Sequence, residues 1–222
     1  MTEVGNRRPL KSRSSGWAQR LAERLAAGRI SPDRISAASV VCAAIGGALL
    51  TASGVLPGGC RCWALVAAAG FVQGRLVCNL LDGMVAVEYG RGSSAGPIWN
   101  ELPDRISDAL LLVAAGYGAA LAGAVWAEPA GWLCAVLSVL TAYVRELGRA
   151  IGQPADFAGP GAKPQRMAVL TVSCLAAAAE PLWGWRGQCL GVGLGVIAIL
   201  TAITVVRRTR TLAARLRAAF NA

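Results

Sequence analysis

Apolar runs alternate with short polar segments along most of the chain. Six such runs cover approximately residues 35–57, 63–81, 100–127, 130–144, 167–182 and 187–206. A helix needs roughly 20 mainly apolar residues to cross a bilayer, and the runs are near this length. The pattern therefore predicts an all-α membrane protein with six transmembrane helices.

Ser31-Pro32-Asp33 marks the expected start of the first of these helices. Serine is a common N-cap, proline suits the first helical position, and aspartate is favourable in the first turn. From Ile35 to Pro57 the chain then carries no charge, which predicts the first span.

The segments outside the six runs divide the chain into four parts. Residues 1–16 are polar and basic and predict a disordered tail, residues 31–206 form the predicted membrane domain, and residues 207–222 predict a basic cytosolic tail. Between the first tail and the membrane domain, residues 17–30 place Trp17, Leu21 and Leu25 on one helical face. This spacing predicts an amphipathic helix in the membrane interface, with a loose cytosolic helix as the alternative.

Composition and charge agree with a membrane protein. The chain is 55% hydrophobic and 15% charged, with a mean hydropathy of +0.51. Its net charge of +10 also suits a nucleic-acid-binding protein, but the basic residues gather between the apolar runs and at the two ends. This placement favours contact of residues 7–13 and 207–217 with anionic lipids, and no nucleic-acid partner is expected.

The basic residues also indicate an orientation. With the N-terminus in the cytosol, the cytosolic segments hold both basic ends, Arg91, Arg105 and the Arg145–Arg166 group, whereas the outer loops hold only Arg61 and Arg186. Positive residues are enriched on the cytosolic side of membrane proteins. We therefore expect a multi-pass protein with both termini in the cytosol, as in a bacterial inner membrane.

The acidic residues are concentrated in one part of the chain. Five of the twelve lie between residues 82 and 108, namely Asp82, Glu88, Glu101, Asp104 and Asp108. Helical spacing places Asn79, Asp82 and Ala86 on one face, and Asn100, Glu101, Asp104 and Asp108 on one stripe of the next helix. Such oxygen ligands suit Mg²⁺ or Mn²⁺, and these ions suit a phosphate substrate. The alternative is a loop of solvated acids.

These residues carry a resemblance to a known family. The run Asn79-x-x-Asp82-Gly83-x-x-Ala86, followed by Gly96-x-x-x-Asn100-x-x-x-Asp104, resembles the signature of CDP-alcohol phosphotransferases and keeps its spacing. The likeness covers roughly residues 17–206, and Ser31-Pro32 and Asp104-Arg105 resemble flanking motifs of the family.

The resemblance implies a set of site residues. Asp104 is the expected catalytic base, and the expected metal ligands are Asn79, Asp82, Asn100, Asp104 and Glu101. The CDP moiety is expected at Asp82, Gly83, Ala86 and Gly96. The expected acceptor phosphate site is Arg145, Lys163 and Arg166, with topology as the alternative reason for their charge.

Three signature positions differ from the family pattern. Asn79 and Asn100 stand where the family has Asp, and Val87 stands where it has Arg. Two negative charges are thereby lost, which predicts weaker metal binding. Glu101 and Asp108 share the stripe and are candidates to replace the lost charge. Arg75, one turn before Asn79, either contacts a substrate phosphate or snorkels to the interface.

The resemblance implies an integral membrane phosphotransferase of phospholipid biosynthesis. It would move a phosphatidyl or other substituted phosphate group from a CDP-linked donor, such as CDP-diacylglycerol, to a small alcohol and release CMP. A first alternative is a catalytically impaired member that acts as a lipid- or nucleotide-binding partner subunit. A second is a small transporter, although its polar groups would be spread over several helices.

The glycine-rich spans also permit a homodimer.

Overall fold

The computed structural model describes residues 15–221, and these residues form α-helices and one 3₁₀-helix without any strand. The elements are α1 (Gly16–Ala27), α2 (Pro32–Ser53), α3 (Gly58–Val87), α4 (Gly96–Leu121), α5 (Ala127–Ala150), α6 (Lys163–Ala179), the 3₁₀-helix η3 (Glu180–Trp183) and α7 (Gln188–Phe220). The predicted all-α class is confirmed. Most of the predicted disordered tail, residues 1–16, lies outside the described residues.

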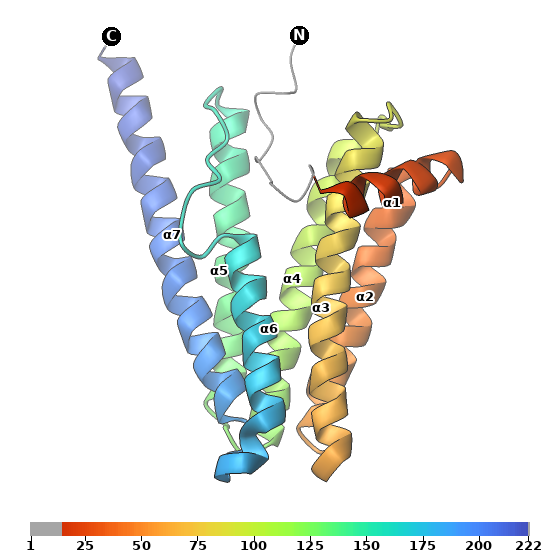
Figure 1. The fold of residues 1–222 in the computed structure, drawn as a ribbon. Helices are drawn as coiled ribbons and strands as arrows, with labels where there is room; N and C mark the ends of the chain where they lie inside the picture. Colours follow the sequence, from red (N-terminus) through yellow and green to blue (C-terminus); the bar gives the residue numbers. More distant parts are fainter. Residues whose placement is uncertain (1–14, 222) are drawn as a thin grey trace.

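The long helices form one bundle that is closed at one end and spread at the other (Figure 1). Short connections join α2 to α3, α4 to α5, and α6 to α7 at the closed end, which we call the η3 end. At the opposite end, which we call the α1 end, α1 lies across the bundle and α7 extends away from it. The core runs along the bundle, where α2 packs on α3 and α4, α4 packs on α5, and α6 packs on α3 and α7.

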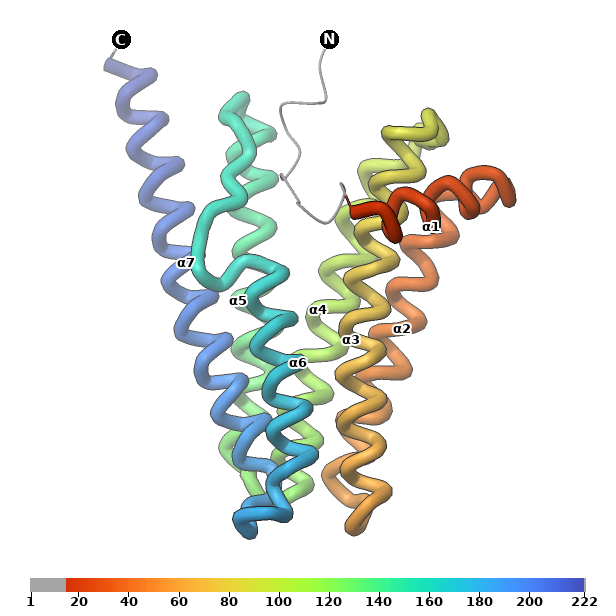
Figure 2. Tube along the Cα trace, in the orientation of Figure 1, coloured from red at the N-terminus to blue at the C-terminus, as the bar shows by residue number. Residues whose placement is uncertain are grey.

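Within residues 15–221, four helices are long and apolar enough to cross a membrane, namely α2, α3, α5 and α7. Helix α4 begins with a charged segment, and α6 has only 17 residues. The segment between α5 and α6 turns back along the bundle before α6 begins, which explains why α6 is short (Figure 2). The crossing of a membrane by α4 and α6 therefore stays a prediction.

The first helix of the bundle starts where the sequence predicts. Ser31 is the N-cap of α2 and its hydroxyl accepts a hydrogen bond from the Arg34 N–H at 3.4 Å, with Pro32 as the first helical residue. The free N–H groups of the first turn need such a partner.

Glycines allow close contact between neighbouring helices. At Gly118 of α4 a side chain would collide with the backbone of α2, and Gly116 and Gly131 pack the backbones of α4 and α5 directly on each other. In the glycine-rich stretch of α7, Gly193 packs on Ser173 and Gly191 on Trp126, whereas Gly195 has open space. Small residues permit such approaches in membrane bundles.

The structure adds detail to two of the predicted segments. Helix α1 packs through Ala18, Ala22 and Ala26 and leaves Trp17 and Leu21 of the predicted apolar face exposed. At the other end of the chain, the predicted basic tail continues α7 without a break to Phe220. The reason is local, because residues 207–220 contain no proline or glycine that would end the helix.

Candidate functional site

Asp104 lies where helices α3, α4 and α6 meet. Its carboxylate accepts hydrogen bonds from the Asn79 amide and the Lys163 ammonium group. Arg75 of α3 lies 3.4 Å from the same carboxylate and also donates to the Asp104 backbone carbonyl at 3.2 Å. Asp104 thus joins three helices, and its side chain is only 12% exposed.

Asp82 forms a second, separate carboxylate position on α3. The Ser36 hydroxyl of α2 donates to it at 2.6 Å, and the Gly83 N–H lies 2.5 Å from its other oxygen. The residue is 6% exposed, and its negative charge interacts with that of Asp104. The first and last acids of the signature are therefore neighbours across α3 and α4.

Asp108 is buried one turn of α4 deeper than Asp104. Its two oxygens pair with Arg75 at 2.6 Å and with Arg166 at 2.5 Å. Arg166 also donates to the Gly161 carbonyl at 2.6 Å and approaches the Thr141 hydroxyl at 3.4 Å. Both oxygens of Asp108 are thus occupied by arginine, so this residue anchors the basic groups instead of facing the two signature acids.

Glu101 lies at the more exposed edge of the same stripe. It pairs with Arg145 of α5 at 2.5 Å and lies 3.9 Å from Arg105. The Arg145 guanidinium also pairs with Glu146 at 2.7 Å and lies 5.3 Å from the centre of the Phe157 ring. Glu101 therefore connects α4 to α5 in this arrangement.

The remaining signature residues lie further out. Asn100 is exposed in the first turn of α4, and Gly96 is the first residue of that helix. Ala86 is half-buried near the end of α3, and Val87 is exposed. Asn79 is thus in direct contact with Asp104, whereas Asn100 lies at the exposed start of α4.

The loop between α5 and α6 positions two of the basic groups. Arg208 of α7 donates to the carbonyl of Ala158 at 3.0 Å and to that of Thr141 at 2.7 Å. Thr204, one turn earlier, accepts a hydrogen bond from the Gly161 N–H at 2.8 Å. Gly161 packs against the α7 backbone with no room for a side chain. These contacts hold the loop directly before Lys163.

The donor set is suited to one hard cation. Asp82 and Asp104 supply carboxylate oxygens, and Asn79 supplies an amide carbonyl, all of the type that Mg²⁺ and Mn²⁺ prefer. Within residues 15–221, no three residues of the types His, Cys, Asp and Glu come together as a metal-binding group. An ion held here would therefore depend on two carboxylates and on amide oxygens.

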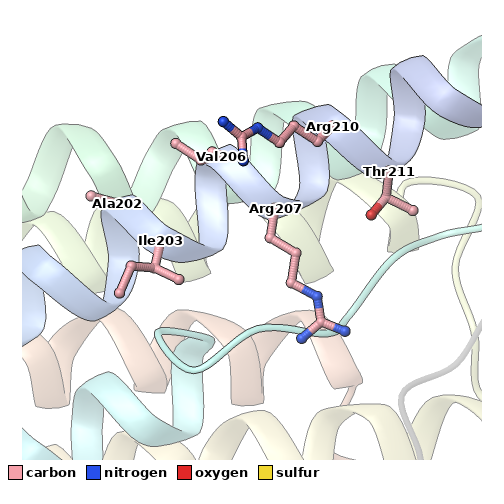
Figure 3. Close-up of a pocket in the computed structure, with 6 residues that line it drawn as sticks. All are labelled: Ala202, Ile203, Val206, Arg207, Arg210 and Thr211. Atoms are coloured by element: carbon pink, nitrogen blue, oxygen red, sulfur yellow. The ribbon is translucent and has the colours of Figure 1, made fainter.

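A groove of about 580 Å³ runs along α7, apart from the acidic site. It is lined by Ala202, Ile203, Val206, Arg207, Arg210 and Thr211 (Figure 3). None of these residues belongs to the acidic site.

Three contacts in the site region had no signal in the sequence motifs. Ser36 binds Asp82 from α2, and Thr204 and Arg208 hold the loop from α7. Ser36 lies one turn after the Ser31-Pro32 helix start, and Arg208 is one arginine within a basic run. Neither position could be distinguished from its neighbours without the packing of the helices.

Comparison with known proteins finds relatives that are transferases of phospholipid synthesis. The chain is 25% identical over 193 residues to phosphatidylinositol phosphate synthase of Mycobacterium marinum, covering 82% of this chain and 73% of the relative. The synthase of Mycobacterium tuberculosis is 26% identical over 193 residues, covering 79% of that protein. A bifunctional IPC transferase and DIPP synthase of Rubrobacter xylanophilus is 34% identical over 152 residues, which are 66% of this chain and 31% of the relative. No family model matches the chain.

Solved structures share the fold. The Mycobacterium tuberculosis phosphatidylinositol phosphate synthase in complex with manganese and citrate superposes with a TM-score of 0.72 at 23% identity, covering 88% of each chain. The same enzyme with CDP-DAG bound gives a TM-score of 0.71 at 23% identity, covering 89% of this chain and 94% of that chain. With the four long apolar helices, these membrane-enzyme relatives show that the chain is an integral membrane protein.

Proposed function

Because the chain belongs to the CDP-alcohol phosphotransferase family, we propose that it transfers a phosphatidyl group from CDP-diacylglycerol to a small alcohol and releases CMP. The observation that carries this proposal is the meeting of the last signature acid, Asp104, with Asn79 and Lys163 from two other helices. One substrate could therefore contact the Asp104 carboxylate, the Asn79 amide and the Lys163 ammonium group, which is a cation suited to phosphate.

In this proposal Asp104 is the base. It accepts the proton of the acceptor hydroxyl, whose oxygen forms a bond to the phosphorus that carries the diacylglycerol. The bond from this phosphorus to the CMP oxygen breaks, so that CMP leaves with its electron pair. Asp82, Gly83, Ala86 and Gly96 are the proposed contacts of the CDP moiety.

The acceptor is proposed to carry a phosphate of its own, held by Arg145, Lys163 and Arg166. These cations come from α5 and the start of α6 and lie beside the acids of α4. Arginine forks and the lysine ammonium suit phosphate oxygens. Lys163 occupies the Asp104 carboxylate here, so we propose that it turns to the acceptor phosphate and leaves Asp104 to receive the proton.

A divalent cation, Mg²⁺ or Mn²⁺, is proposed as the cofactor. Asp82, Asp104 and the Asn79 carbonyl would hold it, with Glu101 and Asn100 as outer candidates. When bound, such an ion neutralises the charge of a diphosphate. The fold neighbour with manganese supports this assignment.

The proposed topology has six spans, with α1 in the membrane interface and the site on the cytosolic side. The exposed Trp17 and Leu21 of α1 suit contact with lipid. The basic α1 end and the few basic residues at the η3 end agree with this orientation in a bacterial inner membrane. A homodimer is compatible with the exposed apolar faces of the bundle.

A second candidate function rests on Asn79, Asn100 and Val87. Each replaces a charged residue of the family signature, and Asn79 donates to Asp104 where an aspartate could not. A member with this site could bind a CDP-lipid as a partner subunit without turnover.

The decisive test follows CMP release from purified full-length protein with CDP-diacylglycerol and Mn²⁺ or Mg²⁺. The acceptor panel contains glycerol phosphate, inositol phosphate, inositol and serine. Release with one phosphorylated acceptor, together with its loss in Asp104→Asn, supports transfer.

Binding separates the two candidates. If no acceptor gives CMP while an active relative does so in parallel, but CDP-diacylglycerol still binds and Asp82→Asn weakens that binding, the partner-subunit function is supported. A protein that neither releases CMP nor binds the donor contradicts both.

A further inference from the structure

The groove along α7 lies outside the phosphotransfer site and has a mixed lining. Ala202, Ile203 and Val206 form its apolar part, and Arg207, Arg210 and Thr211 form its polar part. In Figure 3 the two arginine side chains extend from α7 on either side of its axis, beyond the apolar residues.

An apolar stripe leads into this groove. Val192, Val196, Ile199, Ile203 and Val206 follow one face of α7 and are between 41% and 63% exposed. Their spacing keeps them on one side of the helix along more than a dozen residues. In an integral membrane protein, such an exposed stripe is a surface for acyl chains, and it ends at Arg207 and Arg210.

Arg207 and Arg210 are exposed and have no ion pair or hydrogen bond with any of the residues that the structure describes. Arg208 between them is buried and binds two backbone carbonyls. In this turn of α7, the inner face carries Arg208 and its contacts with the loop. The outer face carries Arg207 and Arg210, which can bind an anion, and its apolar side chains lie toward the preceding turns of the helix.

We propose that this groove binds an anionic glycerophospholipid of the bilayer, separate from the CDP-linked donor. Its phosphate lies between the guanidinium groups of Arg207 and Arg210, and an acyl chain follows Val206 and Ile203 along the stripe. A headgroup with a net negative charge is favoured over a zwitterionic one, because the groove offers two cations and no acid.

A second copy of the chain is the less suitable occupant. In a two-fold symmetric pair along this face, each copy places the same residues opposite its partner. Arg207 and Arg210 would then face arginines, and like charges at such a contact destabilise it. The apolar stripe alone would accept a helix, but its charged end favours a lipid.

The lipid site also shares its helical turn with the loop anchor. Thr204 and Arg208 hold the segment before Lys163 from the inner face of α7. A phospholipid on the outer face would stabilise this turn of the helix, and therefore the loop contacts that depend on it.

The test measures lipid binding and does not require turnover. Purified full-length protein in neutral detergent is titrated with dioleoyl phosphatidylglycerol or dioleoyl phosphatidylcholine, and bound lipid is counted by native mass spectrometry. The test variant is Arg207→Gln/Arg210→Gln. The control is Arg24→Gln/Arg217→Gln, which removes the same charge at two exposed arginines outside the groove.

We expect one phosphatidylglycerol to bind more tightly than phosphatidylcholine, and the test variant to weaken this binding about 30-fold, which corresponds to about 1 kcal/mol for each arginine. The affinity of the control variant for phosphatidylglycerol should remain within about threefold of that of the wild type, because distant surface charges have a small effect. Ile203→Asn, which keeps both arginines, should also weaken binding. Equal loss in the test variant and the control overturns the proposal, as does equal binding of the two lipids. Loss of a dimer in the test variant without loss of lipid assigns the face to a second copy instead.

Discussion

The two ends of the bundle bury ionic groups in different ways. At the η3 end, Arg61 and Glu180 form one pair at 2.8 Å, and the carboxylate also accepts the N–H groups of Gly187 at 2.8 Å and Cys189 at 2.6 Å. Arg61 donates further to the Ala177 carbonyl at 3.0 Å. Both oxygens of the acid accept hydrogen bonds from groups of the fold itself, and within the described residues only the Nε of this Arg61–Glu180 pair lacks a partner.

Toward the α1 end, the acids and bases share their partners. Asp104 contacts Arg75, Arg105, Lys163 and Asn79, and Arg75 also contacts Asp108. The Lys163 side chain is 23% exposed, and several guanidinium nitrogens of this region have no hydrogen-bond partner within the described residues. Guanidinium nitrogens without a partner leave hydrogen-bonding capacity that an anionic ligand could use. The contrast separates a structural pair from a candidate site.

The largest expected effect concerns the base. Asp104→Asn keeps the shape of the side chain, and its one oxygen can still accept hydrogen bonds. The amide cannot take the proton of the alcohol substrate. CMP release should fall by about 10²–10⁴-fold, the usual contribution of a general base.

This measurement needs the folded fraction beside the rate. The melting temperature in detergent reports it. Asp33→Asn is the matched control, because Asp33 is a half-buried acid at the start of α2 whose contact with the Ser93 hydroxyl an asparagine oxygen can keep. A variant with full activity would show that Asp104 is not the base. The ionic groups around Asp104 would then be structural, like the Arg61–Glu180 pair.

At the η3 end, the effect should fall on stability. Glu180→Ala leaves the buried Arg61 charge without its counter-ion and the N–H groups of Gly187 and Cys189 without their acceptor, and such a broken pair costs about 3–5 kcal/mol. Denaturation in mixed micelles checks this value. Arg61→Met/Glu180→Leu removes both charges and should lose less than Glu180→Ala. CMP release per folded molecule should remain that of the wild type, and a fall in that rate would contradict the structural role.

Arg207 and Arg208 are adjacent in α7, but only Arg208 is buried and contacts the loop. Arg208→Ala frees the carbonyls of Ala158 and Thr141 and should loosen the loop before Lys163, with a loss of about 1–3 kcal/mol at this contact. The expected result is a higher KM for the acceptor, an unchanged KM for the donor, and faster hydrogen exchange in residues 152–162. Arg207→Ala, the exposed neighbour, removes no contact with the loop and should change all three much less than Arg208→Ala when no phospholipid is added.

The smallest expected effect concerns the lost signature charge. Asn79→Asp places a carboxylate beside Asp104 and should raise the affinity for Mn²⁺ by about tenfold, because ligand charge tunes such sites. Electron paramagnetic resonance of free Mn²⁺ measures this directly. Asn100→Asp is the comparison, since Asn100 lies exposed in the first turn of α4. A larger gain from Asn100→Asp than from Asn79→Asp would relocate the ion toward the edge of the site.

Much of the site was predictable because helical geometry is local. The spacing of Asn79 and Asp82, and that of Asp104 and Asp108, fixes which residues share a face of α3 or of α4. The start of α2 at Pro32 follows from its cap residues in the same way. These features need no knowledge of neighbouring helices.

The partners across helices could not be predicted from that geometry. Arg61 was expected in an outer loop, yet it is buried in α3 and binds Glu180, which is 119 residues away in the sequence. Glu101 and Asp108 were candidates to replace the lost signature charge, and the structure shows that Glu101 pairs with Arg145 and Asp108 with Arg75 and Arg166. The rotation and height of each helix decide which side chains meet.

The sequence by itself determined the helical membrane class, the start of the first bundle helix and the faces on which Asp82 and Asp104 lie, since all three depend on residues within a few turns. Only the tertiary structure decided that Ser36 binds Asp82, that Thr204 and Arg208 hold the loop before Lys163, and that Arg207 remains on the outside. Arg207 and Arg208 are adjacent arginines with the same chemistry. Their different surroundings arise because successive residues of a helix point about 100° apart, and the packing of α7 buries one direction and exposes the other.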